Sequence, residues 1–310
     1  MRPGSASLVA MEPEELRFDS GGEQCAAWLF RSAAPVAGDA PCVVLGTGAS
    51  CVYDQGLALY AERFAAAGFV ALAFDYRYFG RSGGEPRGLM LAGRQRQDWR
   101  AAIGLARSLD GVDPARIALW GYSLGGGHVQ SLLLGEPGIA AAICVAPVVD
   151  GTRSLLHMGG PRHVARLAAA GLRDGTRALR GAAPWRVPAT GPPGSRALLC
   201  SPGSQPGFEA VTPPDSTWRN ELCARAALAP PYRLEKKTKR IAIPILYCIT
   251  EQDDVNPPEL GKRAAQRAPQ GELKLYPGGH FDPFLAETHQ RMVDDQLNFL
   301  NQLCKDGPFG

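Results

Sequence analysis

The 310-residue chain lacks the patterns that mark several large protein classes. No run approaches the roughly 20 apolar residues that a membrane-spanning helix needs, so we expect a soluble protein. Lys and Arg number 33 against 30 Asp and Glu, and a net charge of +3 is too small to indicate a nucleic-acid partner or an anionic membrane. The first ten residues contain one basic residue and no apolar stretch long enough for a secretory signal.

Cysteine occurs eight times, but never in a spacing that suits a metal. There is no C-x-x-C pair and no cysteine and histidine ligand pattern, so we expect no zinc site. Cys42, Cys144 and Cys248 lie inside apolar, strand-like runs, where a free thiol behaves as a small hydrophobic group. This usage favours a reducing cytoplasm over an oxidising compartment.

Apolar strand patterns alternate with helical patterns through most of the chain. Strands are expected at 16–19, 24–30, 42–46, 69–74, 117–120, 140–146, 243–249 and 273–276, and helices at 57–67, 97–109, 126–134 and 284–303. The first two strands form a hairpin, and the remaining alternation is typical of parallel strands joined by helices. The pattern therefore predicts an α/β fold with a mostly parallel sheet and helices on both faces.

The alternation stops between Asp150 and about Leu234. An Arg-rich and Ala-rich segment there is followed by eight prolines and five glycines between residues 181 and 216. So long a departure inside a compact α/β unit is usually a functional lid. We expect residues 12–150 and 240–304 to form one core, with 151–239 as an inserted cap.

The segment Gly121-Tyr122-Ser123-Leu124-Gly125 lies between an expected strand and an expected helix. A serine on such a sharp turn has a strained backbone and an exposed hydroxyl, as a nucleophile requires. A side chain at either flanking position, Gly121 or Gly125, would collide with the turn. The segment therefore predicts that Ser123 is a nucleophile.

A serine nucleophile needs a base, and the base needs a carboxylate that holds its tautomer. Among five histidines, His280 lies in a glycine-rich turn directly after the last expected strand, where its side chain can be exposed at the end of the sheet. Asp253 and Asp254 follow the strand at 243–249, and Asp150 is a third candidate for the acid. Asp98 is better explained as a residue at a helix start.

Backbone donors for a developing oxyanion are expected on both sides of Ser123. The amide of Leu124, directly after the nucleophile, is one donor, and the glycine-rich loop 46–49 supplies the second from Ala49. The aromatic side chains near these loops are candidates for an apolar acyl pocket. They are Tyr53, Tyr78, Phe79 and Trp185.

Together these segments resemble the α/β-hydrolase superfamily, in particular its dienelactone-hydrolase-like and Xaa-Pro-peptidase-like bacterial members. The resemblance covers the oxyanion strand and loop at 42–49, a "DxRGxGxS" segment at 74–82, the turn at Ser123, the acid motif at 253–258 and the histidine motif at 278–282. The family spacing implies Asp253 as the acid, four residues before Pro257. The chain departs from the family at Thr47, where many relatives have histidine, and at Tyr78, where they have glycine.

The resemblance implies a serine hydrolase that cleaves a carboxylic ester or thioester through an acyl-enzyme, with no metal and no organic cofactor. Carbon–carbon bond hydrolysis, or acyl transfer in a chain-release step on a polyketide-like substrate, is an alternative that the same fold permits. A third hypothesis is that the protein is not catalytic and uses the α/β-hydrolase fold for binding. The expected partner is a small acyl molecule, and the sequence leaves open whether the protein is a homodimer.

Overall fold

The computed structural model describes residues 12–32 and 38–306. The opening segment, for which we expect no secretory signal, lies outside these residues. Among the described residues, no helix is both long enough and apolar enough to cross a membrane.

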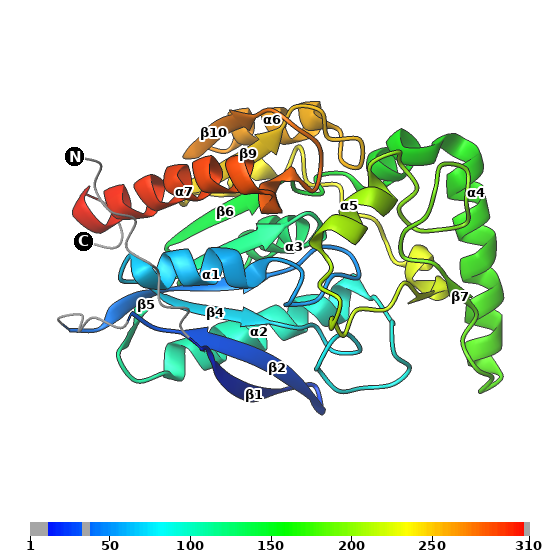
Figure 1. Cartoon of the computed structure of the whole chain (residues 1–310), viewed down its shortest axis with the longest axis horizontal. Coiled ribbons are helices and arrows are strands. Elements are labelled where there is room, and N and C mark those ends of the chain that lie inside the picture. The colour runs from blue at the N-terminus through cyan, green and yellow to red at the C-terminus, as the bar shows by residue number, and fades with distance from the viewer. Residues whose placement is uncertain (1–11, 33–37, 307–310) are drawn as a thin grey trace.

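An eight-stranded sheet forms the centre of the molecule, in the order β1-β2-β4-β3-β5-β6-β9-β10 (Figure 1). Its strands are β1 (Glu14–Ser20), β2 (Glu23–Phe30), β3 (Ala40–Gly46), β4 (Val70–Phe74), β5 (Val112–Tyr122), β6 (Ala141–Val145), β9 (Ile245–Thr250) and β10 (Gly271–Tyr276). From β4 to β10 every neighbouring pair is parallel, whereas β2 pairs antiparallel with both β1 and β4. The predicted mostly parallel sheet is confirmed.

Helices cover both faces of this sheet. They are α1 (Leu57–Ala66), α2 (Ala92–Ser108), α3 (Leu124–Leu132), α6 (Pro258–Arg267) and α7 (Ala286–Asp306). On β3, Val43 and Leu45 pack toward α1 and α7, while Cys42 and Val44 pack toward α2 and α3. Successive strand residues point to opposite faces, and both faces are covered, which explains why the strands are continuously apolar.

Helix α2 begins at Ala92, five residues before the expected start, so the interpretation of Asp98 as a helix-start residue is wrong. Asp98 lies inside the helix and is completely buried. Its Oδ1 accepts a hydrogen bond of 2.6 Å from Nε of Arg77, and the guanidinium of Arg77 also donates to Ser20. This buried ion pair joins α2 to the segment after β4, and no local sequence pattern predicts it.

The segment between β6 and β9 adds no strand to the central sheet. It contains α4 (Gly151–Leu179), β7 (Arg186–Val187), α5 (Ser204–Val211), β8 (Leu222–Cys223) and the 3₁₀ helices η1 (Ala224–Leu228) and η2 (Thr238–Arg240). Its two ends are joined, because the amide of Leu234 donates to the carbonyl of Val149 and the amide of Gly151 donates to the carbonyl of Tyr232. The segment thus leaves the core and returns to it at one place.

Asp174 organises the interior of this segment. Its completely buried carboxylate accepts backbone hydrogen bonds from Trp185 at 2.7 Å and from Arg225 at 2.9 Å. The Arg225 guanidinium lies 3.2 Å from the same carboxylate. One side chain therefore connects α4 with the small β7–β8 sheet and with η1.

We expect Asp174→Ala to lower the free energy of unfolding by about 3 kcal/mol, because it leaves two backbone donors and a partly buried guanidinium without an acceptor. Urea denaturation followed by circular dichroism measures the change. Asp215→Ala, at an exposed aspartate in the same segment, is the control and should change stability by less than about 0.5 kcal/mol. Equal effects of the two substitutions would contradict the role of Asp174.

Candidate active site

Ser123 lies on the turn between β5 and α3, with φ 52° and ψ −115°. The glycines on either side, Gly121 and Gly125, are required because a side chain at either position would clash with the backbone. A Cβ at Gly121 would lie 2.5 Å from the backbone of Gly125, and a Cβ at Gly125 would lie 2.5 Å from the carbonyl oxygen of Thr47. The turn can therefore form only where side chains are absent on both sides of the serine.

The structure brings together the three side chains that the motifs single out. Nε2 of His280 lies 3.0 Å from Oγ of Ser123, and Nδ1 of His280 lies 2.7 Å from Oδ2 of Asp253. All three residues are at least 95% buried. Their spacing is that of a serine, its general base and the carboxylate that orients the base.

The two other candidate acids are engaged elsewhere. Oδ2 of Asp254 accepts the Gly203 amide at 2.6 Å, at the start of α5. Oδ1 of Asp150 accepts the Arg153 amide at 3.0 Å and so caps the first turn of α4. Of the three aspartates, Asp253 alone contacts His280.

The loop that carries Asp253 is fixed by Asn256, a residue that the sequence analysis missed. Oδ1 of Asp253 accepts the amides of Val255 and Asn256 at 2.9 and 2.7 Å, so the carboxylate folds its own loop. The side chain of Asn256 donates to the carbonyl of Ala146 and accepts from Oγ of Ser154. The spacing of Asp253 and Asn256 is a local turn signal that could have identified this contact.

A cavity of about 300 Å³ opens at Ser123. Its described lining contains no charged residue and includes Ala49 and Leu124 beside the serine. Side chains of α4 and of residues 226–232 form much of its wall, so the segment between β6 and β9 contributes to the cavity at the serine. Such a cavity fits an uncharged, apolar group of a small molecule.

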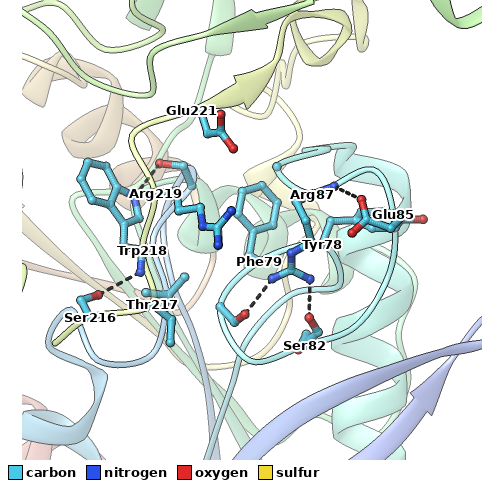
Figure 2. A pocket seen from close by; sticks show the side chains of 14 residues that line it. Tyr78, Phe79, Ser82, Glu85, Arg87, Ser216, Thr217, Trp218, Arg219 and Glu221 are labelled. Atoms are coloured by element: carbon cyan, nitrogen blue, oxygen red, sulfur yellow. Dashed lines mark hydrogen bonds between the residues drawn. The ribbon is translucent and has the colours of Figure 1, made fainter. Parts of the chain in front are cut away.

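The structure places all four aromatic pocket candidates outside the lining of this cavity. Tyr53 stacks on Trp28 with ring centroids 3.8 Å apart, and the guanidinium of Arg173 lies 3.4 Å from the ring centre of Trp185. Tyr78 and Phe79 line a second, larger cavity (Figure 2). Tyr53 and Trp185 thus have partners of their own, which their proximity to loops in the sequence did not reveal.

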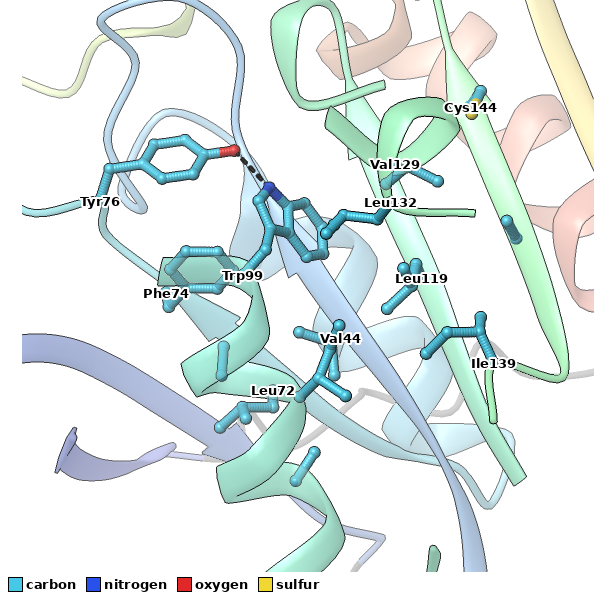
Figure 3. Packing of buried hydrophobic residues seen from close by; sticks show 14 of the residues in the cluster. Val44, Leu72, Phe74, Tyr76, Trp99, Leu119, Val129, Leu132, Ile139 and Cys144 are labelled. Atoms are coloured by element: carbon cyan, nitrogen blue, oxygen red, sulfur yellow. Dashed lines mark hydrogen bonds between the residues drawn. The ribbon is translucent and has the colours of Figure 1, made fainter. Parts of the chain in front are cut away.

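The loop after β3 brings the amide of Ala49 to the same cavity as the amide of Leu124. Within the described part of the chain, neither amide donates a hydrogen bond, so both remain available to a ligand oxygen. The loop is braced from the core, because Nε1 of Trp99 donates to the Tyr76 hydroxyl at 2.9 Å (Figure 3) and that hydroxyl donates to the carbonyl of Thr47 at 3.2 Å.

The α3 helix that leaves Ser123 carries a completely buried histidine, His128. Nδ1 of His128 lies 2.5 Å from the hydroxyl of Tyr232, which also accepts from Arg96, and Nε2 lies 3.0 Å from Oε1 of Gln95. Burial, together with the nearby charge of Arg96, lowers the pKa of His128 from 6.5 to about 3. His128 is thus neutral and structural, and it has no contact with Ser123 through its ring nitrogens.

A family model described as the alpha/beta hydrolase family matches residues 27–295. The chain belongs to the alpha/beta hydrolase family. This family membership and the observed sheet agree with the resemblance and the fold that the motifs indicate.

Among curated relatives, this alpha/beta hydrolase is 38% identical over 300 residues to the quorum-quenching protein AidA of Acinetobacter baumannii, covering 96% of this chain and 98% of that protein. It is 25% identical over 293 residues to the polyketide transferase claH of Penicillium crustosum, covering 88% and 92%. A solved structure of DcsB in complex with its substrate analogue is similar with a TM-score of 0.80 and 23% identity, covering 96% of this chain and all of that one. At 23% identity, the similarity to the DcsB structure shows a shared fold.

The depressed pKa of His128 predicts a loss of stability in acid. Below pH 6.5 His128 binds a proton in the unfolded chain, whereas in the folded protein it stays neutral until about pH 3. The free energy of unfolding therefore falls as the pH falls through this window. At pH 4.5 the loss from this group is about 3 kcal/mol. His128→Gln should therefore lose less stability than the wild type between pH 7 and 4.5, as measured by urea denaturation. Parallel losses in both proteins would refute the prediction.

Proposed function

We propose that this alpha/beta hydrolase is a serine hydrolase that cleaves a carboxylic ester or thioester through an acyl-enzyme on Ser123. The observation that carries the proposal is the continuous hydrogen-bonded series from Ser123 through His280 to Asp253, with contacts of 3.0 and 2.7 Å. These are hydrogen-bond distances at which His280 can take the serine proton as the hydroxyl attacks.

In the proposed first step, Oγ of Ser123 attacks the substrate carbonyl and Nε2 of His280 accepts its proton. Asp253 stabilises the imidazolium that forms, and the free amides of Ala49 and Leu124 donate to the carbonyl oxygen as it becomes negative. His280 then returns the proton to the departing alcohol or thiol, which leaves the acyl group on Ser123. Water, deprotonated by His280, releases the acid and restores the serine.

The lining of the Ser123 cavity supports an apolar acyl group as the part of the substrate that the enzyme holds. A volume of about 300 Å³ without charged side chains suits a small acyl molecule and disfavours an ionised one. The relation to a protein named for quorum quenching supports a small-molecule substrate. The seven buried, unpaired cysteines support the proposed cytoplasmic location.

Acyl transfer is the second candidate, and the relation to a polyketide transferase over 88% of this chain favours it. Transfer needs the same acyl-enzyme and differs only in the acceptor, which replaces water in the second step. The triad geometry is common to both candidates, so the acceptor has to be identified by experiment.

Ser123→Ala should lower kcat on p-nitrophenyl butyrate by about 10⁴-fold or more, because it removes the atom that becomes acylated. A fluorophosphonate probe should label the wild type and not the variant. Ser108→Ala, on a core helix, is the matched control and should keep full activity. Full activity of Ser123→Ala would contradict the proposed mechanism, and failure of the probe to label the folded wild type would favour a binding protein.

The acceptor can be determined by product analysis. We expect the acyl-enzyme formed from a thioester to give mainly the free acid in water, with little ester, thioester or amide when millimolar alcohol, thiol or amine is added. Mass spectrometry of the products measures the partition. A product made mostly by transfer to one acceptor would replace hydrolysis with acyl transfer as the function.

A further inference from the structure

A second cavity, of about 610 Å³, shares no lining residue with the cavity at Ser123. It lies between the loop 78–88 and the cap segment 216–221, with Ser50 and Val52 also on its wall (Figure 2). Nothing in the proposed reaction uses it. Its size is sufficient for a small organic molecule.

Two arginines without carboxylate partners face this cavity. Arg219 is exposed, and its guanidinium has no hydrogen bond or ion pair with any residue in the described ranges. Arg87 donates to the neutral carbonyls of Ser82 and Gly80, the latter at 2.7 Å. Burial lowers the pKa of Arg87, the carboxylates of Glu85 and Asp75 raise it, and the like charge of Arg219 also lowers it. The cavity wall therefore carries two arginines, neither of which has a described carboxylate within 4.0 Å of its guanidinium.

The two carboxylates on the same wall hydrogen-bond or pair with groups other than these guanidinium groups, and Glu85 acts on the charge of Arg87 only at longer range. Oε2 of Glu85 accepts the backbone amide of Arg87 at 2.9 Å, within its own loop. Oε1 of Glu221 lies 3.4 Å from Nη1 of Arg186, which is outside the cavity lining. Neither carboxylate forms an ion pair with Arg87 or Arg219 within 4.0 Å.

Aromatic side chains form the apolar part of the wall. Phe79 is almost completely buried, and Trp218 stacks on Phe208 with ring centroids 5.0 Å apart. The Trp218 indole also donates to Oγ of Ser50 at 3.4 Å, which fixes the ring. In Figure 2 the guanidinium of Arg219 extends toward the ring of Phe79. Charged and apolar surfaces thus meet within one cavity.

We propose that this cavity binds an organic anion, with its carboxylate or phosphate between Arg87 and Arg219 and its apolar part against Phe79 and Trp218. Guanidinium groups present several donors that match the oxygens of carboxylate and phosphate, and an anion between them relieves the repulsion of the two like charges. The site is separate from the acyl cavity, so the proposal does not depend on the chemistry of Ser123.

Isothermal titration calorimetry on the full chain tests the site with phenyl phosphate and benzoate as probes and phenol as the uncharged comparison. We expect at least one anion to bind at least tenfold more tightly than phenol. Arg219→Gln should weaken that affinity at least tenfold and Arg219→Glu should abolish binding. Arg219 donates to no described residue, so both variants should keep the melting temperature of the wild type.

Two further variants separate this site from other sources of binding. Arg180→Gln, at an exposed arginine that ends α4, should leave the affinity unchanged. Leu155→Trp, which fills the cavity at Ser123, should also leave it unchanged. The proposal is overturned if neither anion binds, if Arg219→Gln binds as the wild type does, or if Leu155→Trp abolishes binding.

Discussion

The strained turn at Ser123 is the constraint on which the rest of the site depends. A backbone at φ 52° and ψ −115° costs of order 1–3 kcal/mol and persists only where its surroundings hold it. Here the serine amide donates to the carbonyl of Val145 at 2.9 Å, and the serine carbonyl accepts the amides of Gly127 and Val148. Strand β6 and helix α3 therefore hold the turn from both sides. Because these hydrogen bonds fix the turn, Oγ of Ser123 lies within hydrogen-bond distance of Nε2 of His280.

The segment between β6 and β9 is joined to this turn through Tyr232, which lines the Ser123 cavity at the point where that segment returns to the central sheet. Its ring lies so close to α3 that a Cβ at Gly127 would be 3.0 Å away. Since Oε1 of Gln95 accepts from Nε2–H of His128, Nδ1 of that histidine accepts from the Tyr232 hydroxyl. A neutral, buried histidine therefore couples the cavity wall to the helix that begins at the nucleophile.

Residues with local signals were predictable, and residues held by distant contacts were not. Ser123 and His280 each lie in a short motif whose chemistry depends on neighbours in the chain, and the structure brings both together. Position after the strand left Asp253, Asp254 and Asp150 open as the acid, and only the family spacing implied Asp253. The fold supplies the physical reason, because it turns Asp254 toward Gly203. The contact of Asp174 with Arg225 spans 51 residues, so no window of the cap sequence could indicate it. The four aromatic candidates lie outside the lining of the Ser123 cavity, and two of them, Tyr53 and Trp185, pair with side chains distant in the sequence.

The loop after β3 contributes residues to the linings of both cavities. Ala49 lines the cavity at Ser123, and the next residue, Ser50, lines the cavity with the two arginines. The loop is tied at Thr47, whose carbonyl accepts from Tyr76 and whose hydroxyl donates to the carbonyl of Cys51 at 3.0 Å. Ser50 accepts the hydrogen bond of the Trp218 indole and directly follows Ala49 in the chain. The core therefore fixes one end of this loop through Thr47, and a residue of the second cavity lies at the other end, next to a proposed oxyanion donor.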